Sequence, residues 1–150
     1  MKKNFFIIIC SCAFFLYFFN CSSKKEKKVG EYKDTPIKSD TEIAYDVVKN
    51  YFLNFQNKNV DGILANYSKN KNNNLFSKEY FTEIFNNTEK INIELANEKI
   101  NTKENNEIEI NVDVKITLTF TNEISKTNIY KEQFFLIKED NWKIYSRNYL

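Results

Sequence analysis

Several residue types are absent or rare in this 150-residue sequence, and each shortage excludes a class of function. Histidine does not occur, which excludes Ser-His and Cys-His nucleophiles and removes the commonest metal ligand. The only cysteines are Cys10, Cys12 and Cys21, so residues 22–150 offer no disulfide, zinc site or catalytic thiol. Two glycines and one proline are too few for a glycine-rich phosphate loop. We therefore expect no cofactor, no metal and no assignable catalytic residue.

Charge is nearly balanced, and Arg147 is the single arginine among 22 basic residues. Without the first 20 residues the chain carries 20 basic and 20 acidic residues. A neutral chain with one arginine is a poor candidate for binding a phosphate backbone. We expect no nucleic-acid partner.

The N-terminus has the pattern of a signal peptide. Lys2 and Lys3 precede a mostly apolar run of 15 residues, Phe5 to Phe19. As a helix this run would span about 22 Å, short of the hydrocarbon core of roughly 30 Å. A basic start and an apolar run of this length predict a signal peptide over residues 1–20. The alternative is an uncleaved, tilted anchor.

The end of the apolar run, Phe18-Phe19-Asn20-Cys21-Ser22-Ser23, resembles the lipobox of bacterial lipoproteins, in a looser variant. The resemblance implies cleavage before Cys21 and acylation of that cysteine. Cys12 is a rival, but the apolar stretch before it is too short for a signal peptide. We expect a partner in membrane lipid through acylated Cys21, in the cell membrane or outer membrane, with the following domain outside the cytoplasm. Residues 21–40 lack apolar periodicity and predict a charged tether.

Residues 41–150 show two hydrophobic periods in succession. In the first half, apolar residues recur every three or four positions, which is typical of helices that bury one face. Ser39 and Glu42 have the spacing of a capping box before the first of these helices. The predicted helices cover 41–57, a short segment that begins near Asn59 and includes Tyr67, and a segment from Ser77 to about 86.

From Ile91 apolar and polar residues alternate, which predicts strands with one buried face. Three helices followed by four antiparallel strands give an α+β fold, with the helices packed on one face of the sheet. The pairing of the last two strands stays open. A two-residue turn at Asp140-Asn141 would place Ile137 opposite Ile144, and a three-residue loop would place Leu136 there. After the first strand, the predicted strands cover 107–121, 127–138 and 142–150.

Residues 41–150 resemble the nuclear-transport-factor-2-like, or cystatin-like, superfamily. The residues that carry the resemblance are VVKNYFLNFQNKNVDGILANYS in the first two helices and FFLIKEDNWKIYS in the last hairpin. The resemblance implies a curved sheet that wraps a long helix around a cone-shaped cavity. The superfamily includes isomerases, dehydratases, hydrolases, transport factors and non-catalytic lipoprotein modules, so fold does not settle function.

The candidate ligand-binding residues are Tyr145, Arg147 and Tyr149, which by alternation share one side of the last strand. One interpretation is that the planar guanidinium of Arg147 holds an anionic or aromatic ligand at the mouth of the cone. The other is an arginine stacked between tyrosines and paired with a nearby glutamate. The acidic residues are weaker candidates for a functional site, because we expect Asp46 on the solvated surface of a helix and Asp61 at the start of a helix.

The third predicted strand carries bulky apolar residues on both faces, Phe134 and Leu136 against Phe135 and Ile137. We expect one face to pack on the helices and the open face to form a homodimer, with cover by the tether as the alternative.

The function that we predict is a membrane-anchored envelope lipoprotein with a non-catalytic domain that binds a small ligand or another protein. The alternatives are a lyase or isomerase that uses Asp and Tyr groups in the cone, and a purely structural envelope lipoprotein.

Overall fold

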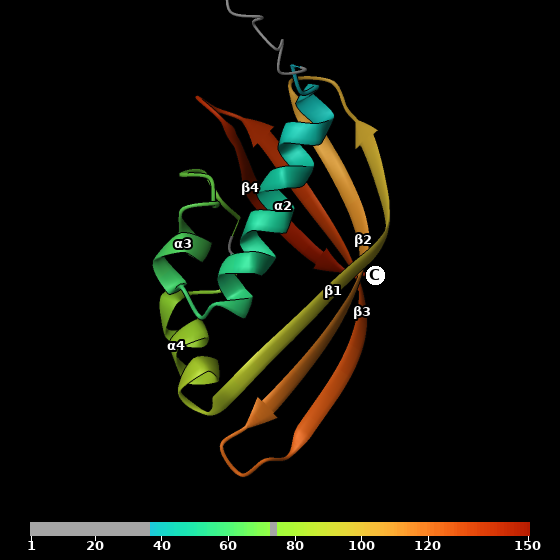
Figure 1. The fold of residues 1–150 in the computed structure, drawn as a ribbon. Coiled ribbons are helices and arrows are strands. Elements are labelled where there is room, and N and C mark those ends of the chain that lie inside the picture. Colours follow the sequence, from blue (N-terminus) through green and yellow to red (C-terminus); the bar gives the residue numbers. More distant parts are fainter. Residues whose placement is uncertain (1–36, 73–74) are drawn as a thin grey trace, which may run out of the picture. The chain divides into compact units, whose positions relative to one another are not determined.

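A computed structural model describes residues 37–72 and 75–150 (Figure 1). The predicted signal peptide, Cys21 and most of the tether lie outside the described residues. Three helices are followed by four strands, as the sequence predicts. In chain order the elements are α2 (Asp40–Gln56), α3 (Val60–Leu64), α4 (Lys78–Asn86), β1 (Thr88–Thr102), β2 (Glu107–Phe120), β3 (Ser125–Lys138) and β4 (Trp142–Tyr149).

The first helix, α2, begins with the predicted capping box. The Ser39 hydroxyl accepts from the backbone N–H of Glu42, and the Glu42 carboxylate accepts from the backbone N–H of Ser39. Such reciprocal bonds satisfy donors that a helix start otherwise leaves unpaired. One face of α2 is buried, and its members are Ala44, Val48, Tyr51, Phe52 and Phe55.

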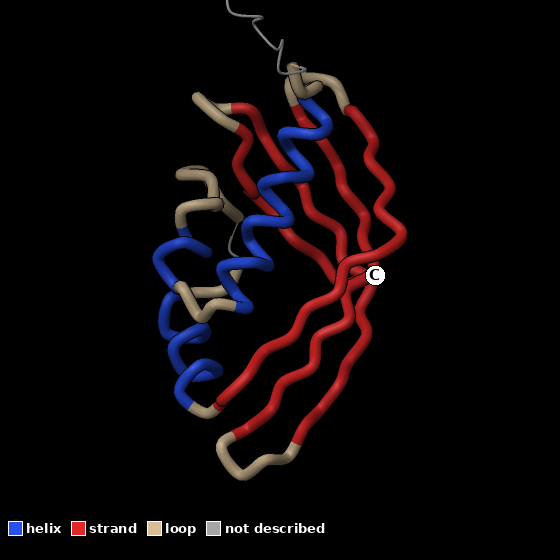
Figure 2. Tube along the Cα trace, viewed as in Figure 1, coloured by secondary structure: helices blue, strands red, loops and turns tan. Residues whose placement is uncertain are grey.

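The four strands form one antiparallel sheet in the order β1-β2-β3-β4. Asn105 and Asn106 both have positive φ in the β1–β2 turn, a conformation that asparagine tolerates well. A bulge interrupts β1 between Ala96 and Lys99, and Asn97, also at positive φ, donates its side-chain amide to Asp113 at 2.8 Å. Bulges bend strands. Figures 1 and 2 show the sheet strongly curved, with the helices on its concave side.

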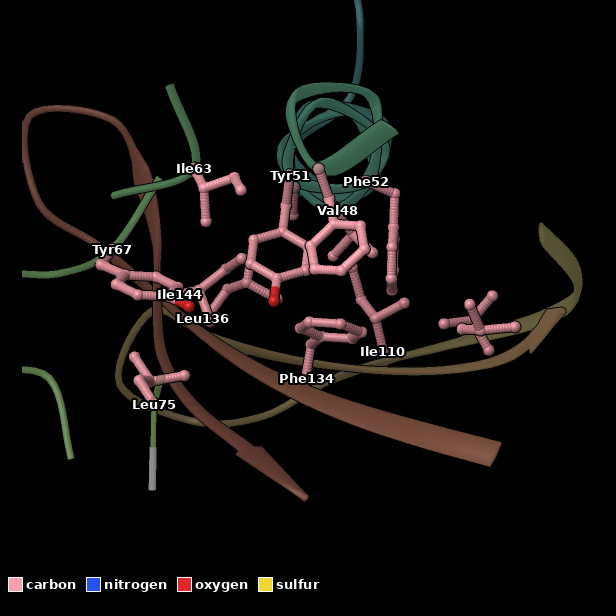
Figure 3. Close-up of a cluster of buried hydrophobic side chains, with 14 of the residues drawn as sticks. Val48, Tyr51, Phe52, Ile63, Tyr67, Leu75, Ile110, Phe134, Leu136 and Ile144 are labelled. Carbon is pink, nitrogen blue, oxygen red and sulfur yellow. The ribbon is translucent and has the colours of Figure 1, made fainter. Parts of the chain in front are cut away.

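The core lies between the concave face and the helices. Along the first half of β2 buried residues alternate with partly exposed ones, so Val114 is 0% exposed while Asp113 points to the outer face. The prediction that one face of the sheet packs on the helices is confirmed. Figure 3 shows Val48 and Tyr51 of α2 directed toward Phe134 on the sheet.

Side-chain bonds also join the start of α2 to the hairpin between β3 and β4. Asp40 accepts from Lys138 at 2.8 Å and from the indole N–H of Trp142 at 3.3 Å. These two donors hold the pKa of Asp40 below its usual value. Trp142 is buried in the core.

Candidate functional site

A β-bulge in β4 decides which side chains enter the concave face. Leu136 pairs with Ile144, as expected for the three-residue loop, but Phe135 pairs with Ser146, so Tyr145 is an extra residue. The extra residue reverses the alternation beyond it. Arg147 and Tyr149 therefore point into the concave face, and Tyr145 lies on the outer face, where its ring is 6.1 Å from that of Phe135. The prediction that all three share one side of the strand is wrong.

The bulge brings Arg147 against a buried carboxylate on β3. Glu132 is 0% exposed and Arg147 is 8% exposed. Arg147 donates from Nε to Glu132 Oε2 at 2.7 Å and from Nη2 to Glu132 Oε1 at 2.6 Å, a bidentate pair. Both carboxylate oxygens are therefore engaged by a permanently charged partner.

Aromatic rings enclose the guanidinium. Its central carbon lies 5.5 Å from the ring centre of Tyr51, 5.1 Å from Tyr149 and 5.0 Å from Phe76. Rings at these distances attract a cation through their negative faces. These contacts agree with the interpretation of an arginine stacked between tyrosines and paired with a glutamate. The ligand-binding role of Arg147 and Tyr149 stays a prediction.

Tyrosine hydroxyls surround the ion pair. The Tyr51 oxygen accepts from Arg147 Nη1 at 2.8 Å, and the Tyr149 oxygen accepts from Nη2 at 3.3 Å. The hydroxyl of Tyr67 is buried, and the Tyr67 ring lies beside that of Tyr51, with 6.1 Å between the ring centres. Burial raises the pKa of Tyr51 and Tyr149, and raises that of Tyr67 to about 12. All three hydroxyls are therefore protonated at neutral pH.

Burial by itself disfavours the charge of Arg147. Its pKa is nevertheless raised above the usual value, because Tyr51 and Glu132 both favour the guanidinium. Arg147 thus stays charged over the physiological pH range.

The ion pair borders a cavity of about 90 Å³ between α2, α4 and strands β2 to β4. Apolar and aromatic side chains form most of its wall, with tyrosine hydroxyls and the guanidinium at the polar end. The lining residues are Tyr51, Phe52, Phe55, Phe76, Tyr80, Ile84, Ile116, Leu118, Asn128, Tyr130, Arg147 and Tyr149. None of these described lining residues carries a carboxylate.

Known proteins match this chain through structure and not through sequence. No family model and no curated protein matches the sequence. A proposed aromatic ring hydroxylase from Novosphingobium aromaticivorans superposes with a TM-score of 0.65 and 15% identity, covering 73% of this chain and 87% of that one. A proposed dehydratase of the NTF2-like family from Streptomyces avermitilis gives 0.61 and 9%, covering 73% and 94%. The chain has the NTF2-like fold.

A third match is a ketosteroid isomerase-like protein from Erwinia carotovora atroseptica, with a TM-score of 0.59, 12% identity, and coverage of 74% of this chain and 95% of that one. The α+β arrangement predicted from the sequence, helices followed by a curved sheet, is therefore the NTF2-like cone. The cavity beside Arg147 lies inside that cone.

Other acidic residues of the NTF2-like domain lie away from the cavity. Asp46 pairs with Lys38 and Lys49 on the surface of α2, and Asp61 pairs with Lys78. In the described part of the chain no group of three potential metal ligands comes together, and no helix there has the length and apolar character needed to cross a bilayer.

Glu132 was not predicted as the partner of Arg147. The sequence does indicate that Glu132 faces the core, because alternation along β3 places it on the same face as the buried Phe134 and Leu136. Tyr67 was placed in the second helix, but that helix ends at Leu64, and Tyr67 instead forms a bridge with Ile144. This bridge carries the Tyr67 ring next to Tyr51.

The outer face of the NTF2-like domain carries the second set of bulky residues of β3. Phe135 and Ile137 are partly exposed there, together with Tyr145 from the bulge. Their partial exposure leaves the expected homodimer a prediction.

Proposed function

We propose that the NTF2-like domain binds a small molecule in its cone without transforming it. The observation that carries this proposal is the Glu132–Arg147 pair beside the cavity. Glu132 has both carboxylate oxygens bound by Arg147 and is not among the described residues that line the cavity, so it is poorly placed to take a proton from a ligand. The pair instead gives the apolar cavity a fixed polar end, which is the usual composition of a ligand site.

The names of the structural neighbours point toward enzymes, but the groups around this cavity do not favour acid–base catalysis. A general base works best when its pKa lies near the operating pH. The tyrosines here have pKa values raised by burial, and Glu132 is held by Arg147. This contrast supports binding over the lyase or isomerase alternative.

The test is native mass spectrometry of the full chain, extracted from its own host in mild detergent. We expect a small-molecule adduct on the unmodified protein and its loss from Ile116→Trp, because the indole would fill the cavity that Ile116 lines. The matched control is Thr117→Trp, on the outer face of the same strand, which should keep the adduct.

Melting temperatures of both variants show whether each is folded. An adduct retained equally by both folded variants would place the ligand elsewhere. The absence of any adduct, together with no response to a library of small aromatic and aliphatic compounds, would contradict the proposal.

We also propose that Cys21 is acylated and anchors the domain to a membrane, outside the cytoplasm. The support is the basic start, the apolar run and the lipobox-like residues that end at Cys21. Several acyl chains would make the anchoring stable, since each buried methylene contributes about 0.8 kcal/mol.

Cys21→Ser should abolish incorporation of labelled palmitate and leave an unprocessed precursor, seen as a larger band on a gel. Cys12→Ser is the matched control and should label normally. Labelling that survives Cys21→Ser but is lost in Cys12→Ser would show that the lipid is on the other cysteine.

A further inference from the structure

The outer face of the sheet carries a polar hollow of about 550 Å³, on the convex side away from the helices (Figure 2). Its side chains come from three neighbouring strands. Lys99 of β1 pairs with Asn111 of β2, and Asp113 of β2 pairs with Lys131 of β3. The bulge in β1 adds Asn97. The volume lies within the range of protein ligand sites, about 300–1,000 Å³, but the lining is polar where that of the cone is apolar.

Asn111 brings to this hollow an acceptor that lacks a donor. Its Nδ2 donates to Glu109 Oε1 at 3.0 Å, whereas its Oδ1 is buried and accepts from no described residue. Glu109 precedes Asn111 on the same face and is not among the described residues that line the hollow, but Asp113, which follows on that face, is. The bond to Glu109 therefore turns the amide oxygen toward the Asp113 side, where the hollow lies. A buried acceptor without a donor is destabilising, so a donor from a ligand would stabilise this atom.

Lys99 and Lys131 bring donors to the same hollow. Neither lysine forms an ion pair with a described residue, although Lys131 stands opposite Asp113 in the register. Asp113 instead accepts from Asn97 Nδ2 at 2.8 Å. An ammonium group has three donors and no acceptor, and a carboxylate has only acceptors. The hollow thus presents donors and acceptors close together.

This mixture of donors and acceptors indicates which chemistry the hollow fits. A simple anion offers only acceptors and would meet the Asp113 carboxylate, and a simple cation would meet two ammonium groups. Neighbouring hydroxyl groups fit both sets, because each hydroxyl carries one donor and two acceptor sites. A ligand with many hydroxyls on a compact frame therefore matches the hollow best.

We propose that the hollow on the outer face binds a saccharide. Its hydroxyls accept hydrogen bonds from Lys99 and Lys131 and donate to Asn111 Oδ1 and Asp113. The hollow and the cone lie on opposite faces of the sheet, so this inference does not rest on the proposed binding function, and its failure would leave that function standing.

The side-chain amides of the hollow report on binding by NMR. The full chain, labelled with ¹⁵N-asparagine and held in a detergent without sugar groups, is titrated with maltose, cellobiose and N,N′-diacetylchitobiose. We expect a saturable shift of the Asn111 amide signals, which are assigned by their loss in Asn111→Ala, with at least one disaccharide. Glutarate, an anion without hydroxyls, and triglyme, an ether without donors, should give no saturable shift, because neither can donate to Asn111.

Two asparagine variants separate the hollow from its surroundings. Asn111→Ala should weaken binding of the disaccharide by about threefold to tenfold, as followed through the amide signals of Asn97. Asn101→Ala is the matched control, because Asn101 also donates to Glu109 Oε1, at 3.2 Å, but is not among the described residues that line the hollow. It should leave the affinity unchanged. Equal weakening by both variants would place the effect at Glu109 and overturn the inference.

A lysine variant tests the donors. Lys131→Met keeps most of the aliphatic stem and should weaken binding by about tenfold or more. Lys115→Met, which removes an outer-face lysine paired with Glu94 outside the hollow, should leave the affinity unchanged. Melting temperatures show that each variant is folded. Glutarate or triglyme binding as tightly as the disaccharides would overturn the inference, and so would the lack of a saturable shift with all three disaccharides.

Discussion

Glu132→Ala should lower the free energy of unfolding by about 3–5 kcal/mol, because it leaves the Arg147 guanidinium buried without its carboxylate. Arg147 is only 8% exposed, so water replaces the lost carboxylate poorly. Small domains are stable by about 5–15 kcal/mol, so this change removes a large share of the total. The change in the free energy of unfolding is measured by urea or guanidinium denaturation of the full chain, with the fluorescence of Trp142 as the readout.

A double variant separates loss of the pair from loss of packing. Glu132→Leu combined with Arg147→Met replaces both charges by apolar groups, and such replacements are often neutral or stabilising. We expect the double variant to lie within about 2 kcal/mol of the unmodified protein. The control is Glu94→Gln, which breaks an exposed pair with Lys115 and should cost less than about 1 kcal/mol. A Glu132→Ala cost as small as that of the control would contradict the buried ion pair.

The second large effect is expected in the middle of β2. Val114→Asp would place a carboxylate where the side chain is 0% exposed, at a cost of several kcal/mol, which is enough to unfold a small domain. Circular dichroism and thermal melting of the full chain measure the loss of cooperative structure.

Asp113→Val is the matched control, one residue away on the outer face. It removes one hydrogen bond from Asn97 and should cost no more than about 1 kcal/mol. If both substitutions caused the same large loss, the outer face would have to be covered as well, contrary to the exposure seen along β2.

The spacing of apolar residues along the sequence predicts most of the fold. The stripe that contains Val48, Tyr51 and Phe52 predicts α2, and Ser39 with Glu42 predicts its start. These signals are local, since each depends on residues within one or two turns. The alternation of β2 is equally local. Both types of element were therefore predicted with bounds close to those of the structure.

The site was harder to predict because it depends on one extra residue. Alternation assigns Tyr145, Arg147 and Tyr149 to one face, and the bulge at Tyr145 separates the first from the other two. Ser146 gave a weak sign, because a polar residue there interrupts the inward series of Trp142 and Ile144. The pairing of Arg147 with Glu132 follows from strand register, which the sequence left open between two alternatives.

The order of the elements along the chain has a consequence for how the domain reaches its native state. α2 comes first in the described sequence, yet its Tyr51 packs on Phe134 and bonds to Arg147, which is 96 residues further along. A growing chain therefore holds an apolar helix without its cover until β3 and β4 have been made. Contacts between distant residues slow folding and leave apolar surface exposed in the meantime. The cone closes only when the last strand has been synthesised.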